Sequence, residues 1–497
     1  MSEQQPPPQD EPQSQPEPRL VPPATSPAVP AIPLPVTSPA PEPVYEPPDD
    51  DRPASASPTE QELAYETPSL AALDRSPPPP AHDPYAALRL GVYRLYVTSY
   101  ALAIIGGQVQ HTALLWQIYQ KTQSALSLGW VAGIQVIPVL LLALPAGHVA
   151  DTVSRKKLLI STQWLLALWG LLLALLTLLG RDWPLLVPAM FGVLLLNGTT
   201  LAFARPARQS LLPQLVPASV FPNAVTWNSS IFELCSLGGP AIGGLLVAFA
   251  GAPVAYLLNA ALLVTCAVIT VRFPATPVTR RADGDAPGFR SLLAGVSFVW
   301  QRKLMLGVML LDLFAVLVGG VTYLLPVFAK DILHVGAIGF GCLRSAPAFG
   351  AAGMAVVLAH RPPMRRAGRA LLVAVAGFGC ATIVFGLSKN FWLSFALLLC
   401  CGACDNVSVV IRHTLVQLLT PDAMRGRVSA VNQIFIGSSN ELGGLESGVT
   451  ADWWGPVRSV VIGGLGTLVT VAAIALSFPS LRRLGRLDEA RSEPAKR

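Results

Sequence analysis

Charged residues stand inside long apolar stretches of this sequence, where they could bind protons or a charged solute. An ionised side chain at the centre of a bilayer costs about 2.5–3.5 kcal/mol on insertion scales, so such residues face a protein interior or a water-filled path. The alternative is that these charged side chains pair with one another and only neutralise the charge of the protein interior. The candidates are Glu233, Asp312, Arg344, Asp405, Glu441 and Glu446, and His111 can join them.

Two of these residues are expected to pair. At a rise of about 1.5 Å per residue, Asp312 and Arg344 each lie about 12 Å in from opposite faces of a roughly 30 Å apolar core. Their stretches follow one another in the chain, so we predict that Arg344 faces a central cavity with Asp312 within reach. Glu441 lies about 15 residues into its own stretch, near the middle of the membrane, which favours a functional role for it.

The first apolar stretch, residues 94–118, is unusually polar for one that spans a membrane. Gln108 and His111 are three residues apart and share a helix face, and Trp116 follows them. Amphipathic groups on a mostly apolar wall suit a binding cavity. The alternatives are hydrogen bonds between helices for the glutamine and a place at the membrane interface for Trp116.

A short polar island joins the second and third apolar stretches. Gly147 lets another helix approach closely, and Asp151 lies one helical turn further on the same face. Arg155 and Lys156 follow, and their charge favours a cytoplasmic loop. The sequence predicts a gate in which Asp151 and Arg155 stabilise a closed cytoplasmic side against the second half, near Arg427. The alternative is an ordinary basic loop.

The composition indicates what positions these side chains. Of 497 residues, 52% are hydrophobic and 13% are charged, whereas a soluble domain carries about 25% charged residues. A spanning helix needs about 20 apolar residues, and this chain has room for twelve. We expect an all-α membrane protein with spans at 94–118, 126–150, 156–180, 184–204, 226–249, 252–272, 304–329, 336–359, 368–388, 391–412, 428–449 and 455–479.

The chain is expected to divide into five parts. Residues 1–88 hold 25 of the 46 prolines and too little apolar surface to offset the entropy of ordering, so a disordered cytoplasmic tail is predicted. Six-helix bundles at 89–272 and 304–480 follow, with a basic linker at 273–303 and a basic tail at 481–497. Lys and Arg number 18 in the loops on one side and 5 on the other, which places both termini in the cytoplasm.

The two halves repeat each other weakly. A shift of 204 residues superposes seven positions of one loop and helix, among them Arg208 on Arg412 and Asn228 on Asn432. Such a parallel repeat is expected of duplicated six-helix units. Asn432 is included among the candidate cavity residues.

With these features the chain resembles the major facilitator superfamily (MFS) of transporters. The island 147–157 resembles the loop between helices 2 and 3 of that superfamily. Gly239, Pro240, Gly243 and Gly244 resemble the signature of its proton-coupled antiporters: the glycines permit tight helix contact and the proline bends the helix. The resemblance implies two six-helix bundles that expose a central site to each side of the membrane in turn.

The resemblance extends to a branch of the superfamily. Segments 206–217 and 425–432 resemble the loops of exporters for enterobactin and macrolides. Two positions differ from the antiporter pattern: Cys235 stands where a glycine is expected, and the expected fourth helix, 184–204, contains no arginine.

Other chemistry finds little support in the sequence. The seven cysteines lie in apolar segments and are expected to be packing residues. The chain has no nucleophile–base pair, metal-ligand cluster or Walker motif at recognisable spacing, so we expect neither an enzyme nor a cofactor or metal. The chain has a net charge of +6, and its basic residues lie in the loops between the spans. Contact with anionic lipid explains this placement better than binding to nucleic acid.

We therefore predict a monomeric, multi-pass secondary transporter of the bacterial inner membrane, surrounded by the lipid bilayer. It would export an amphiphilic small molecule, a drug or a siderophore, in exchange for protons. The alternatives are uptake of a nutrient on the same fold and, from a different class, a membrane enzyme or lipid-handling protein.

Overall fold

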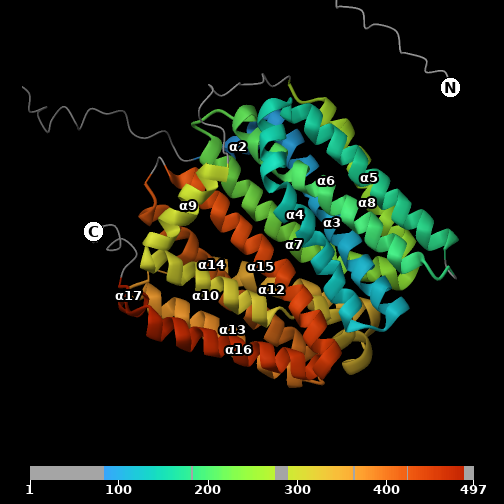
Figure 1. The fold of residues 1–497 in the computed structure, drawn as a ribbon. Helices are drawn as coiled ribbons and strands as arrows, with labels where there is room; N and C mark the ends of the chain where they lie inside the picture. The colour runs from blue at the N-terminus through green and yellow to red at the C-terminus, as the bar shows by residue number, and fades with distance from the viewer. Residues whose placement is uncertain (1–82, 181–182, 275–288, 362–363, 422–423, 486–497) are drawn as a thin grey trace, which may run out of the picture. The chain divides into compact units, whose positions relative to one another are not determined.

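The computed structural model describes residues 83–180, 183–274, 289–361, 364–421 and 424–485. The chain divides into a unit of residues 1–80, which lies outside this described part, and a unit of residues 81–497, which holds all the helices given below. No strand occurs among the described residues. The all-α prediction is thus confirmed, and Figure 1 shows the helices coloured in chain order.

Each half of the chain forms six long helices. The first half comprises α3 (Gly91–Thr122), α4 (Ala125–Thr152), α5 (Arg155–Leu179), α6 (Leu186–Leu215), α7 (Phe221–Ala250) and α8 (Ala252–Val271). The second half comprises α10 (Lys303–Gly319), α12 (Gly336–Ala359), α13 (Ala367–Leu387), α14 (Phe391–Leu419), α15 (Arg425–Trp454) and α16 (Pro456–Ser477). Short helices accompany them in the described part of the chain, among them α2 (Ala86–Arg89), α9 (Phe289–Gln301) and α17 (Pro479–Arg483).

Ten helices in the described part of the chain are long and apolar enough to cross a membrane. The remaining two long helices, α3 and α15, have 32 and 30 residues but more polar side chains. Gln108 and His111 lie on α3, and Asn432 and Glu441 lie on α15. Polar residues of this kind are expected in a span whose face lines a water-filled cavity. The chain is a multi-pass membrane protein.

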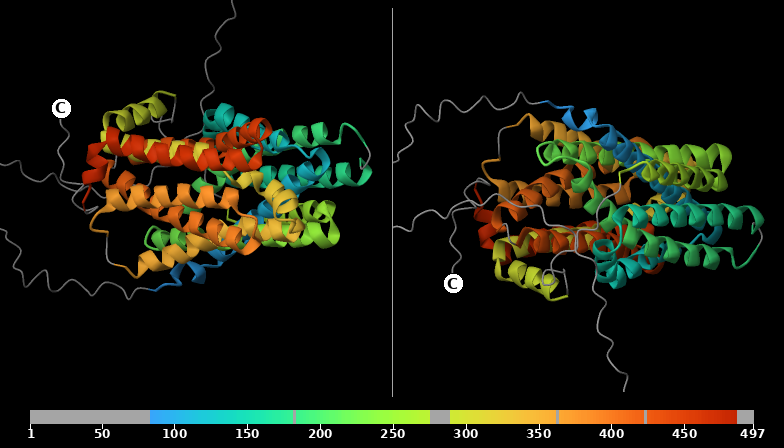
Figure 2. Two further views of the ribbon diagram at one scale, coloured as in Figure 1. Left: turned by 90° about the horizontal axis from the view of Figure 1, so that it is seen from below. Right: turned by 90° about the horizontal axis from the view of Figure 1, so that it is seen from above.

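The six helices of each half pack into a bundle. In the first bundle α3 packs on α7 and α8, and α5 packs on α6 and α8; in the second, α14 packs on α12 and α13, and α13 packs on α16. Figure 2 shows the long helices of both bundles running in one general direction. The bundles meet mainly along two helix pairs, α4 with α15 and α7 with α12.

Glycines make these two crossings possible. A Cβ atom on Gly129 of α4 would lie 2.9 Å from the Cα atom of Gly448 on α15. A Cβ atom on Gly244 of α7 would lie 2.8 Å from the Cα atom of Gly341 on α12. At such distances only glycine lets the two backbones come this close.

The apolar core joins the bundles at one end only. The largest cluster contains Leu114 of α3 together with Phe340 of α12, so it belongs to both bundles. Toward the opposite end each bundle has a cluster of its own, one that includes Tyr93 and one that includes Leu371. We call the joined end the closed end, and the other, where α4 ends and α5 begins at Arg155, the basic end.

Most predicted spans agree with the helices to within about five residues. The predicted span 304–329 is instead interrupted after Gly319, and the other large differences lie at the basic end. The sequence ends the fourth span at residue 204 because prolines follow, yet α6 continues through Pro206 and Pro213 to Leu215. It ends the tenth at 412 because Arg412 is charged, yet α14 continues to Leu419. A proline removes one hydrogen bond from a helix, but α6 is held by its packing on α4 and α5.

The helix that begins with α10 is interrupted inside the membrane. After Gly319 the chain leaves the α-helix for two residues and continues as a 3-10 turn (Thr322–Leu324), a short α-helix, α11 (Leu325–Val327), and a π-helical turn (Phe328–Ile332). The carbonyl of Gly320, freed by the break, accepts a hydrogen bond of 2.7 Å from the Ser447 hydroxyl of α15. Irregular backbone at membrane depth is tolerated where it is buried in protein or lines a cavity.

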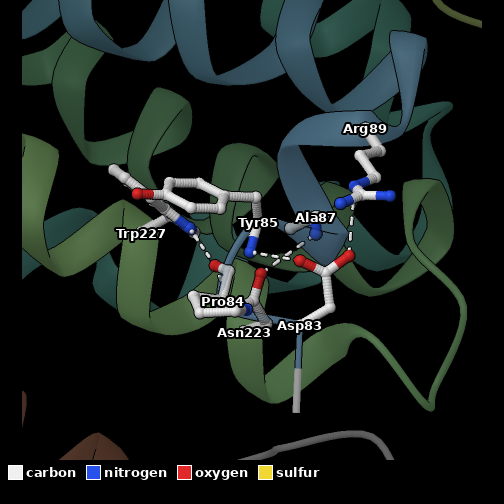
Figure 3. Close-up of polar contacts among 7 residues, drawn as sticks. All are labelled: Asp83, Pro84, Tyr85, Ala87, Arg89, Asn223 and Trp227. Atoms are coloured by element: carbon white, nitrogen blue, oxygen red, sulfur yellow. Dashed lines mark hydrogen bonds and ion pairs between the residues drawn. The ribbon is translucent and has the colours of Figure 1, made fainter. Parts of the chain in front are cut away.

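The segment before α3 is fastened to the start of α7, as Figure 3 shows. The carbonyl of Pro84 accepts hydrogen bonds from the Asn223 amide at 2.8 Å and from the Trp227 indole at 2.9 Å. The Asn223 side-chain oxygen accepts a third, from the backbone N–H of Ala87 at 2.9 Å. We call residues 83–89 the clamp. The predicted boundary between tail and bundle, at residue 88, falls inside it.

Candidate functional site

A cavity of about 1090 Å³ lies between the two bundles. Its wall is mostly apolar and aromatic, and side chains from both halves of the chain contribute. Five of the residues selected from the sequence line it: Gln108, His111, Arg344, Asp405 and Glu441.

The cavity is accessible from the basic end. Tyr96, Arg208 and Phe221, near the basic ends of α3, α6 and α7, lie on its wall. At the other end it stops beneath the closed end, where Trp116 of α3 stacks on Phe340 of α12 with ring centroids 5.6 Å apart. A solute could therefore enter from the basic end but not pass through.

Two charged contacts meet at the inner end of the cavity, and the first one joins the bundles. Arg344 of α12 donates a hydrogen bond to the Nδ1 atom of His111 on α3. Because a guanidinium can only donate, Nδ1 carries no proton in this arrangement. The neutral imidazole then has its proton on Nε2. The amide nitrogen of Gln135 on α4 lies 3.4 Å from Nε2, and because both atoms are donors in this tautomer they form no hydrogen bond with each other.

The second contact lies beside it. Tyr323, in the interrupted stretch after α10, donates a hydrogen bond of 2.5 Å to the Glu441 carboxylate of α15. The Tyr323 ring also meets the His111 ring edge to face, with centroids 5.9 Å apart. We call His111, Tyr323, Arg344 and Glu441 the apex cluster. It holds one cation and one carboxylate at the point where the bundles meet.

The apex cluster leaves one donor unused. The Nη1 atom of Arg344 is buried and has no hydrogen-bond partner among the described residues. Buried donors in folded proteins nearly always have a partner. The guanidinium can therefore accept an additional oxygen ligand from a molecule in the cavity.

Two cavity arginines were missed by the sequence analysis. Arg205 and Arg208 line the cavity from α6, and the guanidinium of Arg208 lies over the Tyr100 ring at 5.5 Å. The prediction that the fourth span contains no arginine is wrong, because α6 extends past both residues. The signal was present: Arg205 and Arg208 are three apart and continue the helical period of the span before them.

The predicted pair of Asp312 with Arg344 does not form. Asp312 makes an ion pair with Arg412 of α14 instead, and Arg344 contacts His111. The cause is the packing order: α12 packs on α14 and α7, whereas α10 packs on α15 and α16. Consecutive helices were expected to be neighbours, and here they are not. Arg344 does face the cavity as predicted.

Four other candidates lie away from the cavity wall in the described part of the chain, among them Glu446 of α15, which accepts a hydrogen bond of 3.4 Å from the Ser447 hydroxyl. Trp116 is 5% exposed and forms part of the closed end, rather than a belt at the membrane interface. Asn432 is also buried, at 5% exposure, within α15. Glu233 lies on α7 next to the cavity residue Phe232, but it is not among the lining residues in the described part of the chain. The glutamines of α3 divide: Gln108 faces the cavity, while Gln117 accepts a hydrogen bond of 2.7 Å from Tyr256 of α8.

The gating island lies at the basic end of the first bundle. A Cβ atom on Gly147 would meet nothing within 4 Å, and the side chain of Asp151 lies outside the described residues. Arg155 donates a hydrogen bond to the carbonyl of Ser210 on α6 at 3.1 Å. Lys156 donates to the carbonyl of Phe273. These contacts stay within the first bundle.

The glycine–proline segment of α7 packs against two neighbours. Added Cβ atoms on Gly239 and Gly243 would lie 2.5 and 2.9 Å from the Cβ atoms of Gln108 and Thr112 on α3. Gly244 faces α12 at the closed end, as described above, and Pro240 is buried between these glycines. The segment thus brings α7 against the polar face of α3 and seals the cavity.

No group of three or more His, Cys, Asp or Glu placed to hold a metal occurs among the described residues. The polar groups of the cavity are instead cations, carboxylates, amides and phenols. Their chemistry is the binding of a polar or charged solute and the exchange of protons.

Solved structures of similar shape are transporters. A bacterial homologue of the iron transporter ferroportin matches with a TM-score of 0.60 and 17% identity, covering 80% of this chain and 99% of the other. A bacterial homologue of the human lysosomal transporter Spinster matches at 0.61 and 15%, covering 81% and 99%. The D-xylose–proton symporter matches at 0.61 and 12%, covering 78% and 97%. At these identities the likeness shows the fold alone.

Curated relatives cover the same region of the chain. The enterobactin exporter EntS of Shigella boydii serotype 4 is 27% identical over 406 residues, which is 80% of this chain and 93% of the relative. The enterobactin exporter EntS of Citrobacter koseri is 26% identical over 402 residues, with the same coverage. Residues 82–496 match the model of the transmembrane secretion effector family, and the chain therefore belongs to this family of the major facilitator superfamily.

Proposed function

We propose that this protein exports an amphiphilic small molecule from the cytoplasm in exchange for protons. The observation that carries the proposal is the cavity, which both bundles line, which is accessible from one end only, and which ends at a cluster of ionisable side chains. A transporter that works by alternating access needs a central site of this kind between two bundles that rock against each other.

The orientation follows from the charge of the loops. Lys and Arg of the predicted loops number 18 on one side and 5 on the other. Without Arg205, Arg208 and Arg412, which lie within α6 and α14, 15 remain on the richer side, which is the basic end. Cytoplasmic loops carry the excess of positive charge in membrane proteins. The basic end then faces the cytoplasm of a bacterial inner membrane, and the structure is the state that loads substrate from inside.

The size and lining of the cavity support a large amphiphilic substrate. Its volume of about 1090 Å³ is at the upper limit of the roughly 300–1,000 Å³ usual for drug-sized ligands. The aromatic wall suits an apolar or aromatic body, and Arg205, Arg208 and Arg344 suit anionic or phenolic oxygens. The relatives named as enterobactin exporters favour a siderophore-like molecule, and they do not favour nutrient uptake.

The apex cluster supplies a route for coupling. His111 can accept the Arg344 hydrogen bond only while its Nδ1 atom carries no proton. A proton that binds Nδ1 breaks this bond between the bundles and leaves two cations side by side. A substrate oxygen that binds Arg344 draws the guanidinium away from His111. Proton and substrate thus act on the same contact between the bundles.

Glu441 is the second proton acceptor of the proposal. It faces the cavity and accepts the Tyr323 hydrogen bond, so a proton on its carboxylate changes the net charge of the apex from balanced to positive. The ionised carboxylate can accept a hydrogen bond from a hydroxyl group of the substrate, whereas a proton on it removes this acceptor, so proton and substrate compete at Glu441. We propose that protonation from outside and deprotonation to the cytoplasm alternate at this carboxylate.

Export can be tested in a strain that lacks its own enterobactin exporter. We expect expression of this chain to restore secretion of catecholates into iron-limited medium, and a protonophore to abolish the restored secretion. Arg344→Gln, produced at equal abundance in the membrane, is the matched inactive control. If neither catecholate secretion nor resistance to a panel of amphiphilic drugs rises above the empty-vector level, export is not the function.

A further inference from the structure

The second bundle contains an ion pair that the exchange at the apex does not use. Arg412 of α14 contacts Asp312 of α10, and their side chains are 4% and 10% exposed. Taking two charges out of water is expensive, and removing one partner leaves an uncompensated buried charge that costs about 3–5 kcal/mol. A pair held at such a cost, away from the cavity wall, needs an explanation.

A small pocket separates this pair from the transport cavity. Its volume is about 20 Å³, whereas one water molecule needs about 10–15 Å³ measured in this way and two to four polar partners. The polar groups around it are Asp312, Asp405 and Ser408, while Val375 and Phe378 of α13 close one side. The pocket therefore has the space and the partners for a single water molecule.

Asp405 connects the two spaces. It lines both the large cavity and the small pocket, and its side chain is exposed. Asp405, Ser408 and Arg412 are spaced i, i+3 and i+7 on α14, so they share the helix face that looks toward Asp312. A continuous polar route leads from the cavity through Asp405 and the pocket to the ion pair.

We propose that Asp312 is a proton-binding site of this transporter, supplied from the cavity through Asp405 and one water molecule in the pocket. A proton from cavity water binds an oxygen of Asp405, the pocket water takes it up while giving a proton to Asp312, and an O–H bond forms there. The ion pair becomes a neutral acid beside a free guanidinium. The reverse steps return the proton to the cavity, and no other reactant is needed.

The other ionisable groups around the route are few. Cys404 of α14 is the remaining titratable side chain on the pocket wall within the described residues, and the α13 side chains there are apolar. Glu233 of α7 acts electrostatically on Asp405 from the first bundle, and Arg412 acts on His413 beside it. Helices α15 and α16 also pack on α10, and none of their described side chains lies on the pocket wall.

Protonation of Asp312 has a mechanical consequence. It leaves the Arg412 guanidinium buried without a carboxylate, which favours a shift between α10 and α14. α10 leads directly into the break after Gly319 and on to Tyr323 of the apex cluster. Protonation of Asp312 can thus change the position of Tyr323 in the apex cluster, through α10 and the irregular segment that follows it.

Infrared difference spectroscopy of the purified full-length protein tests the proposal without any substrate. A protonated carboxylic acid has a C=O stretching band that an ionised carboxylate lacks. Between alkaline and acidic buffer we expect a band in the wild type that is lost in Asp312→Asn, and a shift of that band in Ser408→Ala, which removes a partner of the water. Glu446→Gln, on α15 outside the pocket, should remove only the band of its own carboxyl group and leave the Asp312 band in place.

The same measurement can overturn the proposal. If Asp312→Asn has the same C=O bands as the wild type, Asp312 stays ionised and the pair is only structural. If Ser408→Ala changes neither the band nor its exchange in heavy water, the water route is refuted. Should Asp312→Asn fail to fold, the double variant Asp312→Asn/Arg412→Gln, which has no lone charge, replaces it in the comparison. Because the band needs no transport, a negative export assay does not affect the result.

Discussion

Arg344 of one bundle donates a hydrogen bond to His111 of the other, at the inner end of the cavity. The two residues are 233 positions apart in the chain. Rocking of one bundle against the other must stretch or break this contact, so it reports directly on the state of the transporter. Two events can break this hydrogen bond: a proton binds to the imidazole, or an oxygen ligand binds to the guanidinium.

Neutralising the arginine should disable export. A hydrogen bond that involves a charged group contributes about 1.5–3 kcal/mol, so Arg344→Gln should lower the rate of catecholate secretion by about 10- to 100-fold. Arg344→Lys, which keeps the charge but has a single donor group, should retain part of the activity. Equal rates in all three proteins, at equal membrane abundance, would contradict the assignment.

The crossing of α7 and α12 should tolerate no side chain at Gly244. A Cβ atom there would lie 2.6 Å from the carbonyl oxygen of Ala337, and overpacking of this kind costs about 1–3 kcal/mol. Gly244→Ala should therefore weaken the closed end and expose cysteines placed in the cavity to labelling from outside. Gly238→Ala on the same helix is the matched control, because a Cβ atom there meets nothing within 4 Å. Equal labelling of the two variants would show that this crossing does not hold the closed end together.

Substitutions at Asp312 and Arg412 should have strongly coupled effects on the stability of the protein. Asp312→Asn and Arg412→Gln should each lower the stability of the protein in detergent by about 3–5 kcal/mol, and the double variant by less than either. Thermal unfolding of the three purified proteins measures this. Additive losses would mean that the two side chains do not depend on each other.

Two truncated proteins that differ by nine residues should differ in stability, because only the longer one keeps the clamp. Removal of residues 2–80 leaves the hydrogen bonds of Pro84 and Ala87 in place, so insertion and transport should be unchanged. Removal of residues 2–89 deletes three hydrogen bonds worth about 0.5–1.5 kcal/mol each and should lower the unfolding temperature. Trp227→Phe, which removes one donor and keeps the ring, should have an intermediate effect. If the two deletions unfold at one temperature, the clamp contributes nothing to stability.

The gating island remains a prediction from sequence. Asp151→Asn should reduce export while leaving membrane abundance near normal, because the carboxylate is expected to act only when the basic end closes. Full export by Asp151→Asn would rule the gate out.

The sequence predicted the helices well and the partners of the charged residues poorly. Span positions follow from local apolar composition, and α12 was predicted to the residue at 336–359. The partner of Asp312 depends on which helices pack side by side, and hydropathy carries no information on that order. Arg205 and Arg208 were missed for a related reason: Pro206 looked like the start of a loop, but packing on neighbouring helices keeps α6 helical through it.

The polar composition of α3 also affects how the protein is made. This helix is the first of the long helices to leave the ribosome, yet it is not apolar enough to count as a span on its own, whereas Ala125–Leu142 at the start of α4 has a mean hydropathy of 2.0. A helix that enters lipid poorly alone can enter as half of a hairpin with an apolar partner. Nascent chains that end after α3 should therefore remain extractable from membranes, and chains that continue through α4 should be integrated. The residues that form the transport cavity thus make the first step of assembly depend on the second helix.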